Sequence, residues 1–401
     1  MKGIIWVINQ FAGTPESGWG ERHFYFAQYW IKMGYEVKII SSSYNHMFRQ
    51  NHEVKGLYKH ENYEGVDFYW VKTPKYDPKS FMRFISMLIY TWRVLRLPVR
   101  KLGVPGTVIV SSMPIFPVYV GNRLKKRFKS QLLFEIRDIW PLTLQLLGNK
   151  SASHPAVKFI GWFEKLGYRK ADHVVSLLPN AREHIEEVAG KKVEFQYIPN
   201  GIDPSQLKDE TLPDEIKSQI PKDKFIVGYA GTIGLANALE YLIDAAINLE
   251  KESDLFFVIV GDGYLKSDLM EKTKGCRNIL FLDKIKKNQV QDLVSLFDVC
   301  FVGRNDTPLF KHGVSANKYF DYMLAAKPIL DSNNLIKDPV ELSGCGIIVK
   351  PDSTEAIVKG VLELKRMSKK ERSEMGQKGK EYVLKNHSIK ELALQYSKLF
   401  A

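Results

Sequence analysis

Short apolar runs alternate along the chain with longer segments whose apolar residues recur at helical spacing. The runs are rich in Val and Ile and are bounded by turn-forming or charged residues, as buried strands are. They lie at residues 3–9, 36–42, 107–112, 132–136, 173–178, 225–231, 255–263, 278–282, 298–303 and 327–330. Helical patterns lie between them, as at 21–33, 115–128 and 155–170. Because such strands separated by helices form parallel sheets covered on both faces, the pattern predicts an α/β protein with doubly wound sheets.

A turn-rich and charged passage divides the chain into two halves. Residues 198–224 hold four prolines, and 401 residues are more than one hydrophobic core usually organises. We therefore expect two Rossmann-like domains, at 1–198 and 199–386, and a C-terminal helix at 387–401 that packs back on the first. Ligands of doubly wound domains bind near the carboxyl ends of the strands.

The composition is that of an ordinary globular protein with a basic balance. The chain is 45% hydrophobic and 26% charged, and its net charge is +13. This charge indicates an anionic partner, which could be nucleic acid, acidic lipid or a phosphorylated small molecule. The simpler interpretation is only that the protein is soluble and basic.

Cysteine spacing and hydropathy bear on the compartment. Cys276, Cys300 and Cys345 lie far apart and match neither a metal site nor a disulfide framework, which fits a reducing compartment. The apolar N-terminal run is too short for a signal peptide. The longest uncharged run, 103–122, contains three prolines and cannot cross a bilayer as a helix. We expect a cytoplasmic protein.

The stretch HGVSANKYFDYMLAAKPIL, residues 312–330, combines a helical pattern with two charges in its first turns. If Ser315 caps this helix, Lys318 lies in the first turn, where free backbone N–H groups and the helix dipole favour a phosphate. Asp321 follows one turn later and could accept hydrogen bonds from ribose hydroxyls. The alternative is a surface Lys–Asp pair that contributes a few tenths of a kcal/mol, about what such pairs give.

Six stretches in order along the chain resemble the family 4 glycosyltransferases. They are SGWGERHFYFAQYWIKMGYEVKIISS, FEIRDIWPLTLQLLG, IPNGID, GYAGTIGLANALEYLIDAA, VIVGDG and VSANKYFDYMLAAKPIL. The second stretch is similar to a signature of a bacterial surface-polysaccharide or O-antigen-type subgroup. The resemblance implies the GT-B fold, in which two Rossmann-like domains face each other across a cleft. It also implies a retaining transferase that moves a hexose or N-acetylhexosamine from a nucleotide-diphosphate sugar, with UDP the expected nucleotide.

The resemblance assigns the donor nucleotide to the second domain. Asp321 stands where the family's second glutamate binds ribose, and Lys318 would lie near the diphosphate. Gly231 and Thr232 would approach the donor through their backbone, which needs a residue without Cβ. Gly261, in the VIVGDG stretch, belongs to the same predicted site.

The resemblance assigns the acceptor to the first domain. Gly18 and Gly20 would let the first loop approach the phosphates of the donor. Asp138 follows the strand at 132–136 and could orient or help to deprotonate the acceptor hydroxyl. Many family members have a histidine at the position of Arg137. The alternative to a catalytic role is a structural ion pair between Arg137 and Asp138 that anchors the loop, and the sequence does not rank it below catalysis. His23 follows the first loop, but a histidine on a helix is more often structural.

Two departures from the family pattern shift the expected source of positive charge. The glutamate that often lies eight residues before the ribose-binding one is replaced here by Gly313. The loop GTIGLANAL lacks the arginine and lysine that many members place there. Because charge builds up on the leaving diphosphate, other cations must neutralise it. Arg304, which follows the strand at 298–303, and Lys318 are the candidates; the alternative for Arg304 is a solvated loop residue.

We expect no metal ion and no cofactor. No Asp-x-Asp triplet is present to hold a donor-bound Mg²⁺, and no zinc-type spacing occurs. The expected chemistry is metal-independent, with protein cations in place of the metal.

A basic amphipathic segment points to a membrane surface. Residues 79–101 place aromatic and aliphatic side chains at helical spacing between arginines and lysines, and 123–129 form a second basic run. The alternative is a core-packing helix with basic ends. In the family context, the segments would attract the inner face of the plasma membrane and a polyprenyl-diphosphate-linked or oligosaccharide acceptor.

Two other functions fit part of the pattern. A nucleotide-sugar epimerase shares the fold, but it needs no acceptor site and no membrane-docking helix. A nucleic-acid-binding protein would explain the charge, yet no nucleic-acid motif is present and the basic residues cluster beside apolar aromatics. We therefore expect no nucleic-acid partner.

Overall fold

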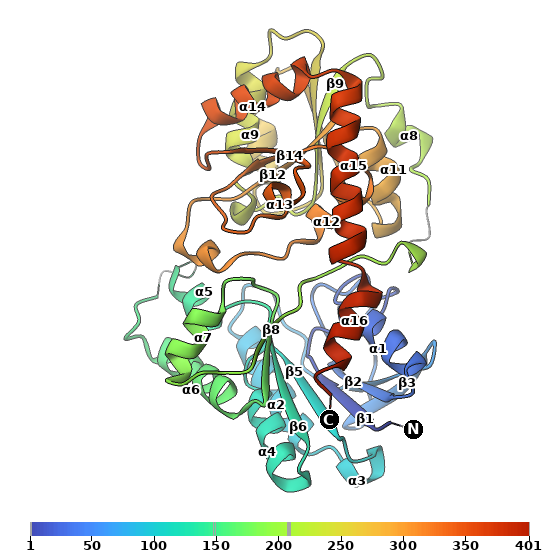
Figure 1. The fold of residues 1–401 in the computed structure, drawn as a ribbon, viewed down its shortest axis with the longest axis vertical. Helices are drawn as coiled ribbons and strands as arrows, with labels where there is room; N and C mark the ends of the chain where they lie inside the picture. Colours follow the sequence, from blue (N-terminus) through green and yellow to red (C-terminus); the bar gives the residue numbers. More distant parts are fainter. Residues whose placement is uncertain (1, 147, 149, 207–209, 401) are drawn as a thin grey trace. The chain divides into compact units, whose positions relative to one another are not determined.

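The computed structural model describes residues 2–146, 148, 150–206 and 210–400. The chain divides into two compact units, residues 1–200 with 389–401, and residues 201–388. The division after residue 200 lies two residues from the predicted boundary at 198. Figure 1 shows that each unit has a sheet between layers of helices.

The first unit contains an eight-stranded sheet in the order β3-β4-β2-β1-β5-β6-β7-β8. The strands are β1 Ile4–Ile8, β2 Glu36–Ser42, β3 Tyr58–Tyr63, β4 Val66–Val71, β5 Thr107–Ser111, β6 Gln131–Ile136, β7 His173–Ser176 and β8 Phe195–Tyr197. All neighbouring strands are parallel except β3 and β4, which form an antiparallel hairpin at the edge. Central β1 is buried on both faces, because Trp6 and Ile8 enter one hydrophobic cluster while Ile5 and Val7 enter the other.

Helices cover both faces of this sheet. They are α1 Arg22–Lys32, α2 Met82–Leu95, α3 Val99–Leu102, α4 Val118–Phe128, α5 Trp140–Leu146, α6 Pro155–Lys170, α7 Arg182–Ala189 and α16 Ile389–Ser397. The C-terminal helix α16 lies beside α1, where the indole N–H of Trp30 donates to the carbonyl of Ala393 at 3.0 Å (Figure 1). Helices α2, α4 and α6 bury their apolar residues in the cluster on the opposite face.

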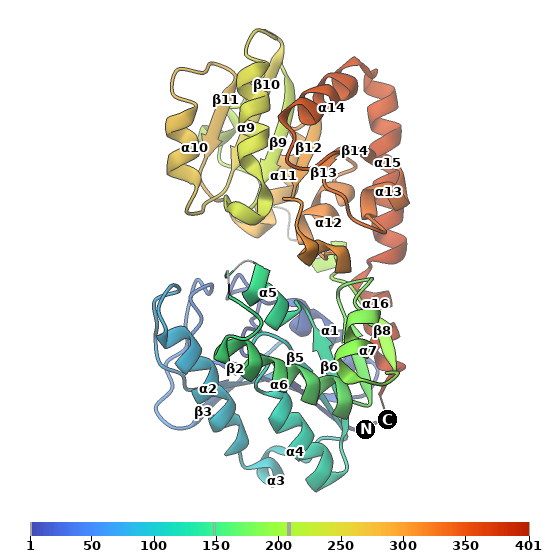
Figure 2. The same ribbon diagram turned by 90° about the vertical axis from the view of Figure 1, so that its left-hand side faces the viewer.

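The second unit contains a six-stranded, fully parallel sheet in the order β11-β10-β9-β12-β13-β14. Its strands are β9 Phe225–Ala230, β10 Leu255–Val260, β11 Ile279–Leu282, β12 Val299–Gly303, β13 Ile329–Ser332 and β14 Gly346–Val349. Its α-helices are α8 Asp214–Lys217, α9 Leu239–Asn248, α10 Lys266–Lys272, α11 Val290–Ser295, α12 Asn317–Leu324, α13 Pro339–Ser343, α14 Thr354–Arg366 and α15 Lys369–Asn386. The described residues of this unit also form the 3₁₀ turns η1 Pro204–Gln206, η2 Leu235–Asn237, η3 Lys287–Gln289 and η4 Pro308–His312. Figure 2 shows this unit from the side.

The predicted α/β class with doubly wound parallel sheets is confirmed. The β3–β4 hairpin and strands β8 and β14 were not predicted. The hairpin turn is Glu64-Gly65, both residues with positive φ, and it lacks the Asn-Gly or Asp-Gly pair that marks such turns in sequence. Among the described residues, no helix has both the length and the hydropathy needed to cross a membrane.

Candidate functional site

Two glycine loops meet at the carboxyl ends of β9 and β10. Gly231 has φ +157° and Gly261 has φ +150°. A Cβ atom at Gly261 would lie 1.8 Å from the carbonyl oxygen of Gly231, so only glycine permits this approach. The next glycine, Gly263, is confined in the same way by the carbonyl of Ile233, 2.0 Å from the position of a Cβ. The backbone of the β9 loop is therefore held in one position by its neighbour.

The side chain of Lys318 reaches this loop from α12. Its Nζ donates to Tyr229 Oη at 3.0 Å and to Asn237 Oδ1 at 2.5 Å. Tyr229 Oη and Asn237 Nδ2 both donate to the carbonyl of Thr232, at 2.7 and 2.9 Å. Helix α12 is fixed beside β9 because Tyr322 Oη bonds both the N–H and the carbonyl of Ala230. The lysine and the backbone of the loop thus form one connected network.

The N-terminus of α12 differs from the prediction at one residue. Its N-cap is Ala316, in extended conformation with φ −86° and ψ 129°, so the prediction that Ser315 caps the helix is wrong. The N-cap residue Ala316 itself forms no side-chain cap. Backbone N–H groups of the first turn lie beside Lys318, where a phosphate could accept hydrogen bonds from them.

Arg304 directly follows β12 and is only 8% exposed. Its backbone N–H donates to the carbonyl of Ser332 at 2.9 Å, and its guanidinium carbon lies 5.2 Å from the centre of the Phe310 ring. Its Nε is buried and has no hydrogen-bond partner among the described residues. The alternative of a solvated loop arginine does not fit this burial.

Arg304 and Lys318 influence each other electrostatically. Desolvation and the nearby Arg304 lower the pKa of Lys318 to about 7, against a smaller opposing effect of Asp331. Burial and the neighbouring Asp338 raise the pKa of Asp331 well above its usual range, which weakens it as a counter-ion. Two cationic side chains therefore lie close together in a partly buried region, where the buried Asp331 balances them only weakly, and such a region favours an anion.

Asp321 is largely buried, and its contacts are with residues other than Lys318. Its Oδ2 lies 3.7 Å from Lys287 Nζ, and its carbonyl accepts from Gln291 Nε2 at 3.0 Å. No hydrogen bond or ion pair joins Asp321 to Lys318 in the described structure. The alternative of a direct surface Lys–Asp pair is therefore not observed.

In the first unit, the loop after β1 is built on Gly18 and Gly20, with φ +69° and +78°. A Cβ at Gly20 would lie 2.0 Å from the carbonyl oxygen of Phe11, while one at Gly18 would meet the side chain of Arg49. Gly20 is thus required by the turn itself, whereas at Gly18 the flexible Arg49 side chain can move and only the positive φ favours glycine. A role in binding phosphates remains a prediction.

Asp138 is exposed at the end of β6, in the loop that leads to α5. Arg137 is partly buried, and its backbone N–H donates to Ser112 Oγ at 2.9 Å. No ion pair joins Arg137 and Asp138, both of which the structure describes, so the anchoring pair considered as an alternative is not seen. Desolvation by the surrounding chain raises the pKa of Asp138, and the nearby charge of Arg137 opposes that rise.

A buried ionic cluster behind this loop was not predicted. The carboxylate of Glu135 lies 3.2 Å from Arg22, 3.1 Å from His23 Nε2 and 2.8 Å from Ser111 Oγ. Nearby charges, with Arg22 the largest favourable effect, lower the pKa of Glu135 despite its burial. Burial lowers the pKa of His23, which is fully enclosed. Arg22 also donates to the carbonyls of Ile198 and Pro199, so the cluster braces β6, α1 and the end of the first unit.

Among the described residues, no three His, Cys, Asp or Glu side chains come together as potential metal ligands. The predicted residues Gly231, Thr232, Gly261, Arg304 and Lys318 lie around the β9 loop, and Asp321 lies on the same helix as Lys318. Tyr229, Asn237 and Tyr322, which bond Lys318 or the loop backbone, were not predicted.

Comparison with known proteins places both units in glycosyltransferase families. Residues 20–206 match the model of Glycosyltransferase Family 4, and residues 224–366 match that of Glycosyl transferases group 1. The chain is 24% identical over 385 residues to a putative colanic acid biosynthesis glycosyl transferase, WcaI, of Escherichia coli K12. That alignment covers 90% of this chain and 91% of the relative.

Solved structures with the same fold are also glycosyltransferases. Sucrose-phosphate synthase from Thermosynechococcus elongatus has a TM-score of 0.74 at 16% identity, covering 99% of this chain and 98% of that one. Anabaena Alr3699/HepE, in complex with UDP and glucose, has a TM-score of 0.67 at 13% identity, with 99% and 98% covered. The fold is therefore GT-B, and the chain belongs to the family 4 glycosyltransferases.

Proposed function

We propose that this glycosyltransferase uses a UDP-sugar, a UDP-hexose or UDP-N-acetylhexosamine, and retains the configuration of the transferred sugar. The observation that carries the donor proposal is the network of Lys318 with Tyr229, Asn237 and the backbone of the β9 loop. Arg304 adds a second cation beside it. Support for UDP comes from the Anabaena structure of the same fold, which holds UDP and glucose.

In the proposed reaction, protein cations stabilise the leaving diphosphate without a metal ion. Lys318 and Arg304 balance the charge that develops as the glycosidic bond breaks, and the first-turn N–H groups of α12 donate to the phosphate. Asp321 holds the ribose. Asp138 orients the acceptor hydroxyl, with its carboxylate exposed at the end of β6.

We assign the acceptor to bacterial polysaccharide assembly, and propose that it is lipid-linked, as a polyprenyl diphosphate. The relative WcaI is named for colanic acid biosynthesis, and an O-antigen-type pathway is chemically similar. The enzyme would lie on the inner face of the plasma membrane, held by residues 79–101 and 123–129. In support, Trp92 is half exposed with Arg96 stacked 4.0 Å from its ring centre, and the last turn of α4 holds Lys125, Lys126 and Arg127.

A nucleotide panel tests the donor proposal. A ligand that binds only the native state raises its stability, by about 2.7 kcal/mol at a concentration of 100 times Kd. We expect UDP to raise the melting temperature of the purified protein, with GDP, ADP and dTDP giving smaller shifts. If none of the four nucleotides stabilises the protein, the donor site is wrongly assigned.

A further inference from the structure

Helices α2 and α6 of the first unit present one continuous aromatic surface. We call it the aromatic patch and define it by Phe81, Phe84, Phe159 and Trp162; Phe81 is 73% exposed, Trp162 55% and Phe159 44%. Phe84 stacks on Phe81 at 5.6 Å and lies 6.5 Å from Phe159. Trp162 joins them through Phe163, whose ring lies 5.2 Å from Phe159 and 4.8 Å from Trp162. Large exposed apolar patches of this kind mark interaction sites.

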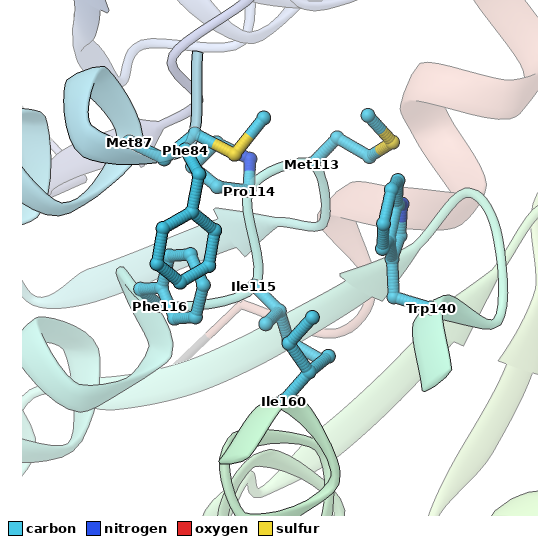
Figure 3. Close-up of a pocket in the computed structure, with 8 residues that line it drawn as sticks. All are labelled: Phe84, Met87, Met113, Pro114, Ile115, Phe116, Trp140 and Ile160. Carbon is cyan, nitrogen blue, oxygen red and sulfur yellow. The ribbon is translucent and has the colours of Figure 1, made fainter. Parts of the chain in front are cut away.

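An apolar pocket lies directly beneath the aromatic patch. It is lined by Phe84, Met87, Met113, Pro114, Ile115, Phe116, Trp140 and Ile160 (Figure 3). These side chains contribute one nitrogen and no oxygen, and that nitrogen, Trp140 Nε1, has no hydrogen-bond partner among the described residues. The pocket has a volume of about 40 Å³, which exceeds the roughly 10–15 Å³ that one water needs but is well below the roughly 150 Å³ of a cavity that holds benzene, so it has room for a methyl-sized group. Because the lining offers a water almost no partners, an apolar group suits the pocket better.

The pocket joins the patch to the candidate acceptor loop. Phe84 belongs to both the patch and the pocket wall, and Phe116 of the wall lies 5.8 Å from Phe159 of the patch. Figure 3 shows Trp140 on the side of the pocket opposite Phe84 and Phe116. Trp140 follows Asp138 by two residues. A hydrocarbon chain with one branch in the pocket could therefore extend along the pocket wall from the patch to the loop that carries Asp138.

The positive charge of the protein is concentrated in the same part of the chain. Residues 78–171 contain 17 Lys and Arg against three Asp and Glu, a net charge of +14, whereas the whole chain has +13. The rest of the protein is thus close to neutral. On α6 the exposed charged residues are all basic, namely Lys158, Lys165, Arg169 and Lys170, whereas Glu164 is buried. Aromatic side chains surrounded by basic ones complement an anionic bilayer surface.

We propose that the apolar pocket seats a methyl branch of the hydrocarbon chain of a lipid-linked acceptor, while the aromatic patch rests on the anionic bilayer that contains it. This inference rests on the proposed transfer to a lipid-linked acceptor. It extends that proposal by assigning the hydrocarbon chain of the acceptor to a defined pocket, and by adding α6 to the surface that faces the membrane. The polar end of the acceptor then lies at residues 137–140.

A short, water-soluble prenyl diphosphate tests the pocket without a membrane. We expect farnesyl diphosphate to bind the full-length protein at least about tenfold more tightly than inorganic diphosphate, measured by calorimetry, because its chain buries apolar surface. Ile160→Phe and Met87→Phe fill the pocket from α6 and α2, and each should remove this difference. Trp162→Ser, outside the pocket, should retain it. Equal affinity for the two ligands in the wild-type protein would overturn the proposal.

Vesicle binding tests the patch separately. Phe81→Ser/Trp162→Ser should lower co-sedimentation with vesicles of phosphatidylglycerol and phosphatidylcholine at least about tenfold, whereas Ile160→Phe should not. Undiminished vesicle binding of the double variant, or a wild-type dimer that this variant converts to a monomer, would contradict the membrane assignment. Stabilisation by UDP is measured on every variant. If UDP still stabilises the second unit while farnesyl diphosphate fails, the pocket proposal is wrong and the donor proposal stands.

Discussion

Lys318 is the residue on which the proposed donor site depends. Its ammonium contacts Tyr229 and Asn237, two neutral partners, and Arg304 lies close enough to oppose its charge. Burial also raises the pKa of Tyr229, which keeps that hydroxyl protonated and able to donate to Thr232. A diphosphate would supply the missing negative charge. The affinity for the donor should therefore be coupled to the protonation of this lysine.

The pH dependence of donor binding follows from this coupling. Because the pKa of Lys318 is about 7 in the free protein, the amine loses its proton above that pH, and binding of an anion must then restore it. We expect the association constant of a UDP-sugar to be level below pH 7 and to fall by up to about tenfold per pH unit above it. A nucleotide sugar is the right ligand, since its esterified diphosphate has no second ionisation near pH 6. A level profile up to pH 9 in calorimetric titrations would contradict the coupling.

The same pKa shift predicts the stability of a lysine-free variant. The folded protein holds the proton of Lys318 less tightly than the unfolded chain, whose lysines titrate near 10.4, so stability rises with pH between about 7 and 10.4. Lys318→Met removes this dependence. The melting temperature of Lys318→Met minus that of the wild type should therefore be larger at pH 6 than at pH 9. Lys359→Met, at an exposed position of α14, should show no such difference.

Gly261 tests the contact between the two loops. Gly261→Ala places a Cβ 1.8 Å from the carbonyl oxygen of Gly231 and should cost more than about 3 kcal/mol of unfolding free energy. Gly275→Ala is the matched control in the same unit, since Gly275 also has positive φ, +94°, but no atom lies within 4 Å of its Cβ position. It should cost about 1–2 kcal/mol. Chemical denaturation measures both, and equal costs would show that the loops are not in contact.

At the scale of elements, the sequence predicted most of the parallel strands but missed β3, β8, β14 and also β4, which is buried and internal to the sheet. Helix α6 has the predicted limits, since Pro155 at its first turn and the cap at His154 are local signals. Strand β3 alternates exposed and partly buried residues without a continuous apolar run, so hydropathy alone did not reveal it. The start of α12 was misplaced by one residue because Ser315 resembles a cap, whereas the chain first turns helical after Ala316. The Glu135 cluster was missed since it joins residues more than a hundred positions apart.

The capping box of α15 gives a prediction at this scale. Ser368 Oγ accepts from the N–H of Glu371 at 3.2 Å, and the Glu371 carboxylate accepts from the N–H of Ser368 at 2.7 Å. Ser368→Ala should lower the unfolding free energy by about 0.5–2 kcal/mol. Ser373→Ala, at an exposed position within the same helix, should change it by less than about 0.5 kcal/mol. Equal effects in urea denaturation would show that the box does not stabilise the helix.

At the scale of the whole molecule, we expect the charges of the two units to bind different partners, an anionic membrane in the first unit and a nucleotide in the second. The excess charge lies in residues 78–171, on exposed helices of the first unit, whereas Lys318 and Arg304 are buried or partly buried in the second. Salt screens exposed charges far more than buried ones. Binding to anionic vesicles should fall at least about tenfold between 0.05 and 0.5 M NaCl, an order-of-magnitude expectation. The affinity for UDP should change much less over the same salt range. A loss of UDP affinity as steep as the loss of vesicle binding would contradict the assignment of exposed charges to the first unit and buried charges to the second.

The central claim is that Lys318 and the β9 loop hold the diphosphate of a nucleotide. Calorimetric titration of UDP at pH 6.5 into wild type, Lys318→Met and Lys359→Met tests it most directly. Loss of a charge-assisted hydrogen bond costs about 1.5–3 kcal/mol, so Lys318→Met should bind UDP roughly 10- to 100-fold more weakly, with Lys359→Met unchanged. Wild-type affinity in a folded Lys318→Met protein would contradict the account.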